Sequence, residues 1–143
     1  MPPVEKLEVL RTFTVGAPAT ALYAELHAVA DAAFDAIARN LIPGTPARDL
    51  AAAAAVIGQA GFTAIDDLVH GFGGGYLPPV VPAPGRPVPS PDLVLAAGMT
   101  VVVQPNVVTR DGRAGVQTGE LLLVTDQGPQ RLHAYPPGLV QLG

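Results

Sequence analysis

The first part of the chain shows two kinds of hydrophobic spacing in succession. Residues 5–15 alternate their side chains and are rich in β-branched and aromatic types, which predicts a strand. After Pro18, hydrophobic residues recur every three or four positions, at Leu22, Leu26, Val29, Ala33, Ile37 and Leu41. This spacing predicts one long amphipathic helix, with Pro18 in its first turn and its end at Pro43-Gly44.

A second helix is predicted between Thr45 and Gly61. Thr45 can act as its cap, and Pro46 fits the first turn because no backbone N–H is needed there. Hydrophobic residues follow at helical spacing, at Leu50, Ala54 and Ile57. The many alanines of this segment indicate close packing against a sheet or another helix.

The Gly- and Pro-rich segment 71–91 interrupts these patterns and predicts a loop or extended polyproline-like chain. It is either a linker or a loop that faces a substrate. Beyond it, three segments have the character of strands, with turn signals at Asp111-Gly112 and Gln127-Gly128. The three segments are residues 99–108, 115–125 and 130–135.

A strand, two helices and several antiparallel strands, in that order, indicate an α+β fold. A length of 143 residues suits a single domain, 1–143. Its predicted parts are a strand region 1–16, a helical pair 17–61 and a sheet region 62–143.

Composition narrows the classes of function. Hydrophobic residues make up 49% and charged residues 14% of the chain, so some apolar surface is expected to meet a partner. The net charge is -4, no basic cluster occurs and there is no Trp, which argues against nucleic-acid binding. The absence of Cys excludes disulfides and thiolate metal sites. Without a secretory signal or a long apolar run, we expect no membrane association and a cytoplasmic location.

Four segments resemble the motifs of one peptidase family. RTFTVG from Arg11 resembles a strand that ends in RTF, and HGFG from His70 resembles HGIG. GMTVVVQPNVV from Gly98 resembles a GM-apolar-EPG strand, and GVQTGELLLVTDQGPQRL from Gly115 resembles GVRIEDTVLVTEDGPERL. These are motifs of the M24 metallopeptidases, which include methionine aminopeptidases, Xaa-Pro peptidases and creatinase.

The resemblance, from about residue 7 to residue 133, implies the family's pita-bread fold. In that fold, two helices pack on a curved antiparallel sheet built from two related halves. This chain resembles the C-terminal part, with residues 1–16 as the last strand of the first half. We therefore expect a degenerate and N-terminally truncated domain, whose missing portion would precede Met1.

The family's chemistry uses two divalent ions such as Mn or Co, held by two Asp, one His and two Glu. The resemblance aligns His70 with the ligand histidine and Glu8 with the second aspartate. Gln104 and Gly119 occupy the positions of the two glutamates. Leu77 occupies that of a second histidine, seven residues after His70.

A tight two-metal centre is therefore not expected, because each missing carboxylate removes an attraction of several kcal/mol in a partly dry site. No cofactor is predicted. Glu120 follows Gly119 directly, and strand alternation turns it to the opposite face. Only a bulge would let Glu120 replace the missing ligand.

Three functions remain open from the sequence, and so does the question of whether the chain is an enzyme. It is an inactive or metal-independent relative of the Xaa-Pro aminopeptidases, a metal-free creatinase-like C–N hydrolase, or a module that binds peptides or proteins. In the hydrolase, His70 acts as acid or base and Gln104 holds a peptide or small amide substrate. In the binding module, Gly74, Tyr76 and the proline loop form a peptide groove. His70 and Gln104 also suit purely structural roles as buried, hydrogen-bonded groups.

A half-domain leaves a sheet edge and an apolar face exposed, so we expect a homo-oligomer or a complementing half-domain as partner. His27 and His133 are predicted at the surface. The adjacent acids Asp66 and Asp67 are expected to be solvated or to cap a turn.

Overall fold

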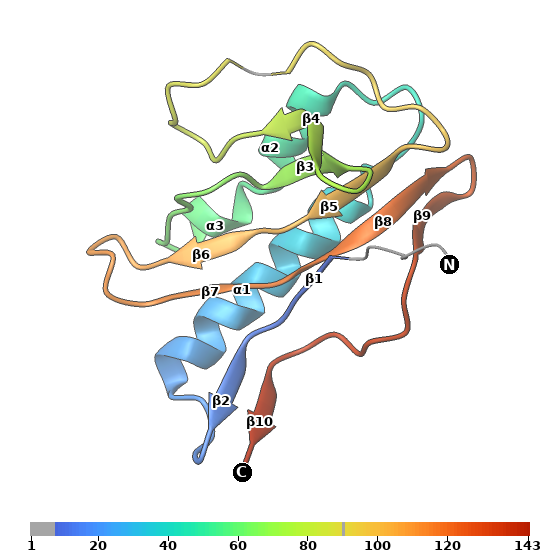
Figure 1. Cartoon of the computed structure of the whole chain (residues 1–143). Coiled ribbons are helices and arrows are strands. Elements are labelled where there is room, and N and C mark those ends of the chain that lie inside the picture. The colour runs from blue at the N-terminus through green and yellow to red at the C-terminus, as the bar shows by residue number, and fades with distance from the viewer. Residues whose placement is uncertain (1–7, 90) are drawn as a thin grey trace.

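A computed structural model describes residues 8–89 and 91–143 as a sheet with one long helix packed across it (Figure 1). The helical elements are α1 (Ala21–Ala38), the 3-10 helix η1 (Ala47–Asp49), α2 (Leu50–Ala53) and α3 (Val56–Gln59). The strands are β1 (Val9–Leu10), β2 (Phe13–Val15), β3 (Val69–Phe72), β4 (Tyr76–Val81), β5 (Thr100–Val103), β6 (Asn106–Val108), β7 (Gly115–Gln117), β8 (Gly119–Thr125), β9 (Gly128–Arg131) and β10 (Val140–Leu142). The α+β prediction is confirmed.

The main sheet has the order β1-β8-β5-β3-β4, with β9 also paired to β8, and its neighbours are antiparallel. The strands β6 and β7 form an antiparallel pair of their own, and β2 and β10 form a parallel pair. In Figure 1 the β2–β10 pair lies beside the first turn of α1, and the C-terminus lies next to β10.

The register of the strands separates two faces of the sheet. Val69, Val103 and Glu120 pair across β3, β5 and β8 and share one face. Together with other apolar strand residues on that face, Val69 and Val103 belong to the hydrophobic core that α1 covers. His70 pairs with Val102 and Val102 with Leu121, so these residues share the opposite face, which we call the site face.

The predicted long helix is present as α1, with the Thr20 hydroxyl as its N-cap acceptor for the Tyr23 amide. Its predicted limits are wrong, because it begins at Ala21, after Pro18, and ends at Ala38, before Pro43-Gly44. Residues at helical spacing are fully buried against the sheet, at Leu26, Ala30, Ala33 and Ile37. Burying this apolar stripe stabilises the helix more than its intrinsic propensity does.

The second predicted helix is not continuous, which corrects the sequence-based expectation. It consists of η1, α2 and α3, with a break at Ala54 and Ala55. Thr45 is not its cap, because Pro46 stands at the N-cap position of η1 and the Thr45 carbonyl accepts the Leu95 amide. The bridge between Pro46 and Val94 holds this end of the segment extended.

The prediction of a loop throughout 71–91 is wrong in its first half. Strands β3 and β4 form a hairpin, and Gly74 supplies the positive φ of +96° in its turn. Because β4 is an edge strand, Pro78 and Pro79 need not donate backbone hydrogen bonds to a further strand.

The outer segments also differ from the predicted strands. The described part of 5–15 forms two short strands, β1 and β2, and the rest of that prediction lies outside the described residues. The predicted strand 130–135 ends already at Arg131, and β10 carried no recognised signal. Within the described ranges, no helix is long and apolar enough to cross a membrane.

Candidate functional site

His70 lies on β3 at the centre of the site face, and only 1% of its surface is exposed. Its Nδ1 lies 2.9 Å from the backbone oxygen of Gly71. Because a carbonyl oxygen only accepts, Nδ1 must carry the proton. The second ring nitrogen, Nε2, is therefore the atom available to a ligand.

Glu8 approaches His70 across the site face. Its Oε1 lies 3.7 Å from Nε2 of His70, and its side chain is 30% exposed. The Glu8 backbone oxygen accepts the Leu121 amide at 2.9 Å, which places Glu8 beside β8. Val102 and Leu121 are buried on this same face, which α1 does not cover.

Tyr76 stacks on the imidazole of His70, with ring centroids 3.8 Å apart and planes at 21°. Its hydroxyl donates to Oδ2 of Asp67 at 2.7 Å. Burial, the hydrogen bond to Asp67 and the nearby acids raise the pKa of Tyr76. Arg86 donates to Oδ1 of the same Asp67 at 3.1 Å. Asp67 thus anchors the ring that covers His70 and is not simply solvated, as the sequence had suggested.

Gln104 follows β5 and is 6% exposed. Its side-chain amide donates to the backbone oxygen of Asp67 at 3.4 Å, and its own backbone oxygen accepts from the Gln117 amide at 3.1 Å. Nearby, the Asn106 side chain accepts the amides of Ile65 and Asp66. Gln104 and Asn106 together fasten the loop that carries Asp67.

Gly119 opens β8 in close contact with the end of β5. A Cβ atom at position 119 would lie 2.5 Å from the Val103 oxygen and 2.8 Å from Cα of Gln104. Side chains do not approach backbone this closely, so a larger residue requires the two strands to separate. This position therefore supplies no ligand.

Glu120 lies on the α1 face, because the β1–β8 ladder runs through Gly119 and Glu120 without a bulge and Glu120 pairs with Val103 of β5. Its carboxylate contacts Arg11 at 2.7 Å and Arg131 at 2.7 and 3.0 Å. Burial alone would raise the pKa of Glu120, but the hydrogen bonds from Arg131 and Arg11 outweigh it and lower the pKa. Glu120 therefore does not reach the site face, where it would have to lie to replace the missing metal ligand.

The two other histidines were predicted at the surface, and this is wrong for both. His27 is 4% exposed on the packed side of α1, with Nδ1 at 3.1 Å from Asp31. The His133 side chain is 8% exposed, with Nε2 at 3.2 Å from Glu120. The sequence shows polar residues next to both histidines, but it does not show that tertiary contacts bury their side chains.

The site-face residues do not fit a two-metal centre. Of the positions that the resemblance aligns with metal ligands, Glu8 and His70 supply one carboxylate and one imidazole, whereas Gln104 and Gly119 supply no anion. Among the residues that the structure describes, no group of three or more His, Asp or Glu side chains could hold a metal ion. The roles predicted for Gly74 and Tyr76 in ligand binding stay predictions. Leu77, which the resemblance aligns with the family's second histidine, is 47% exposed.

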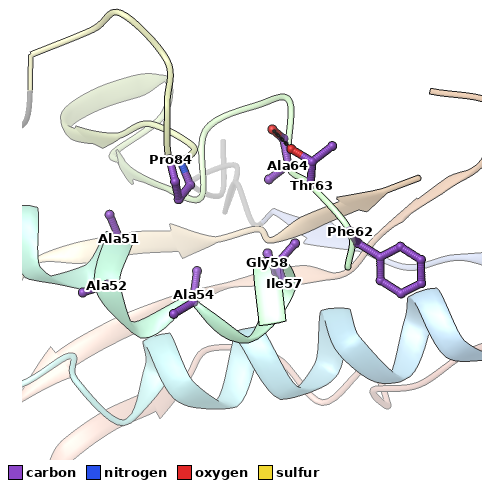
Figure 2. Close-up of a pocket in the computed structure, with 10 residues that line it drawn as sticks. Ala51, Ala52, Ala54, Ile57, Gly58, Phe62, Thr63, Ala64 and Pro84 are labelled. Carbon is purple, nitrogen blue, oxygen red and sulfur yellow. Dashed lines mark hydrogen bonds between the residues drawn. The ribbon is translucent and has the colours of Figure 1, made fainter. Parts of the chain in front are cut away.

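A separate apolar cleft of about 380 Å³ lies between the α2–α3 segment, residues 62–64 and Pro84 (Figure 2). Small side chains leave this space open, since alanines and Gly58 line much of it. Pro84 of the predicted proline loop lines this cleft, but His70, Tyr76 and Gln104 do not.

The sequence model described as Metallopeptidase family M24 matches residues 7–126. No curated protein matches the chain in sequence. Dipeptidase PepE from Mycobacterium ulcerans is 26% identical with a TM-score of 0.78, over 94% of this chain and 35% of that one. Xaa-Pro dipeptidase from Bacillus anthracis is 26% identical with a TM-score of 0.72, over 94% and 37%. A dipeptidase from Pyrococcus horikoshii, 23% identical with a TM-score of 0.80 over 95% and 37%, supports the fold alone. The chain thus spans little more than a third of these proteins.

Proposed function

Because this chain belongs to metallopeptidase family M24, we propose that it uses the family's pita-bread surface to bind peptides without the two-metal reaction. Position 119 carries this proposal. A glutamate there would have to push apart the backbones of β8 and β5, since even a Cβ atom would lie 2.5 Å from the Val103 oxygen. The close packing of these two strands supports a site that works without a metal-ligating glutamate at position 119.

Gln104 supports the same proposal. Its amide donates to the Asp67 carbonyl, a bond that a carboxylate at this position could not make because it lacks a donor. Asp67 in turn holds Tyr76 over His70. Gln104, Asp67, Tyr76 and His70 thus form a connected set of contacts, in which Gln104 holds the backbone of Asp67.

Metal content tests the proposal directly. After loading with Mn or Co and desalting, the purified chain is expected to retain less than one ion, and His70→Ala is expected to behave in the same way. Nearly two ions per chain that His70→Ala loses would overturn the proposal. Peptides that begin with Met or Xaa-Pro are expected to bind without being cleaved.

The orientation of His70 favours a second candidate, a metal-free hydrolase. The Gly71 carbonyl fixes the proton on Nδ1, as in many catalytic histidines, and leaves Nε2 able to act as a base. Nε2 would take a proton from water while the water oxygen adds to the carbonyl carbon. The C–N bond would then break, and His70 would return the proton to the leaving nitrogen. Turnover that survives chelators and disappears in His70→Ala would favour this candidate.

A complementing partner remains part of the proposal, because the chain spans little more than a third of the related structures. Val15 is 79% exposed and Leu142 48% exposed at the β2–β10 pair. A parallel pair of two short strands is stable only with additional packing. Light scattering after gel filtration is expected to show a homo-oligomer, or a larger complex when the remaining part of such a domain is supplied. A cytoplasmic location stays a prediction.

A further inference from the structure

The β2–β10 pair turns apolar side chains outward. Phe13 and Val15 share one face of β2, because they alternate with Thr14 along the strand. The register pairs them with Val140 and Leu142, which adds these two side chains of β10 to the same face. Phe13 is 43% exposed, Val15 79% and Leu142 48%. We call these four apolar residues the β2–β10 patch.

The opposite face of the pair is turned toward the rest of the molecule. The hydroxyl oxygen of Thr14 is buried there and has no hydrogen-bond partner among the described residues. The neighbouring Thr12 hydroxyl donates to the Gln117 carbonyl at 2.9 Å, which fastens this side of the segment to the end of β7. Strands at a protein surface ordinarily turn apolar residues inward and polar residues outward. The β2–β10 pair reverses this pattern, and such a reversal marks a surface that meets a partner.

The charges around the patch favour a second copy of the chain as that partner. Residues 12–24 and 134–143, which form and flank the patch, contain no Asp, Glu, Lys, Arg or His. A twofold contact brings every charged group near its own copy, so two identical surfaces meet without repulsion only where they are uncharged. A strongly charged partner, in contrast, would gain no attraction from this surface.

We propose that the β2–β10 patch binds the same patch of a second copy, in a twofold dimer whose two strand pairs pack face to face. The two layers would lie about 10 Å apart, as packed sheets do. Each patch would then remove the apolar side chains of the other from water, and Phe13 would supply the largest contact area. The inference rests on the proposed function, because it specifies the partner that the proposed function requires.

The dimer contact is separate from the proposed peptide site. In Figure 1 the β2–β10 pair lies at the opposite end of the molecule from β3 and β4. These two strands carry His70 and Tyr76. A dimer through the patch therefore leaves the peptide site uncovered, and the two proposals can fail independently.

The segment before β10 is held in place without the patch. Arg11 donates to the Pro136 carbonyl at 2.9 Å, and Arg131 donates to the Tyr135 carbonyl at 2.7 Å. Both bonds join this segment to the main sheet through side chains outside the patch. A polar substitution on the exposed face is therefore expected to break the dimer without unfolding the chain.

Light scattering after gel filtration, over a dilution series, tests the dimer. The native chain is expected to show twice the mass of one chain. Val15→Asp places a carboxylate in the contact from each copy and is expected to weaken dimerisation at least about hundredfold. The matched control is Val88→Asp, the same change at an exposed position outside the patch, and it is expected to remain a dimer. Circular dichroism shows that both variants are folded.

A charge swap tests the twofold arrangement. Val15→Lys is expected to be monomeric by itself, like Val15→Asp. An equal mixture of the two variants is expected to form a dimer again, because each contact then joins an ammonium group and a carboxylate. A mixture that stays monomeric would overturn the face-to-face packing.

The remaining outcomes distinguish this inference from peptide binding. A native chain that is monomeric at every concentration would overturn the inference, and so would a dimer that Val15→Asp leaves intact. Peptides that begin with Met or Xaa-Pro are expected to bind Val15→Asp as tightly as they bind the native chain. An intact dimer that binds none of these peptides would overturn the proposed function and support the inference.

Discussion

Two carboxylates on opposite faces of the sheet, Glu120 and Glu8, show how differently one chain can use the same group. The Glu120 carboxylate is 5% exposed and bonded to two guanidinium groups, from Arg11 and Arg131. Arg11 and Arg131 also donate to backbone oxygens of residues 135 and 136, so they tie the C-terminal segment to the sheet. Glu8 is 30% exposed and faces an imidazole at 3.7 Å. A carboxylate bonded to two guanidinium groups stabilises the fold, whereas no hydrogen bond from a described residue reaches the Glu8 carboxylate.

The largest effect that this comparison predicts is on folding. Glu120→Gln leaves Arg11, whose side chain is 3% exposed, without its counter-charge and should lower the free energy of unfolding by about 3 kcal/mol. The same change at the more exposed Glu8 should alter it by less than about 0.5 kcal/mol. Urea denaturation of both variants is the measurement. Equal losses would remove the distinction between the two carboxylates.

The second prediction tests whether β8 and β5 are packed too closely to admit a side chain at position 119. Gly119→Ala should cost about 2 kcal/mol of unfolding free energy, because its methyl group would contact the Val103 oxygen. Gly58→Ala is the matched control in α3, where a Cβ atom meets nothing within 4 Å. It should be neutral or stabilise by about 0.5 kcal/mol through helix propensity. A neutral Gly119→Ala in the same urea series would show that the strands can separate and admit a side chain.

The third prediction concerns acid. The arginines lower the folded-state pKa of Glu120 below its ordinary value of 4.5, so its contribution to stability is present above that pH. It is lost as the pH falls through the lowered pKa. The difference in unfolding free energy between the native chain and Glu120→Gln should therefore be constant near neutral pH and shrink below pH 4.5. A difference that does not change with pH would contradict the assigned ion pairs.

The smallest effect concerns the ring that covers His70. Since the pKa of Tyr76 is raised, its hydroxyl should stay protonated in base where ordinary tyrosines ionise. Its small stabilising contribution is present below the ordinary pKa and is lost only as the pH rises through the raised one. Absorbance titration should show one late tyrosine, which Tyr76→Phe removes. If Tyr76→Phe leaves the titration curve unchanged in shape, the bond to Asp67 is not formed in solution.

Local patterns predicted what depends on local spacing. The helical spacing from Leu22 to Leu41 predicted α1, since its apolar stripe follows the period of the helix. The segmented second helix and the β3–β4 hairpin were missed, because strand pairing at Pro46 and across β4 overrides local preference. The pairing of His133 and Arg131 with Glu120 joins residues more than ten positions apart, and no local spacing reveals it.

For the site, the sequence by itself determined which groups are present: one histidine at 70, an amide at 104, a glycine at 119 and a carboxylate at 8. Strand alternation also predicted that Glu120 and Gly119 face opposite ways. Only the tertiary structure decided that Glu8 faces His70, that Tyr76 stacks on it and that Asp67 holds Tyr76. The contact of Glu8 with His70 joins segments far apart along the chain, and the contacts of Tyr76 depend on the β3–β4 hairpin. Both follow from strand order and register, which side-chain periodicity does not encode.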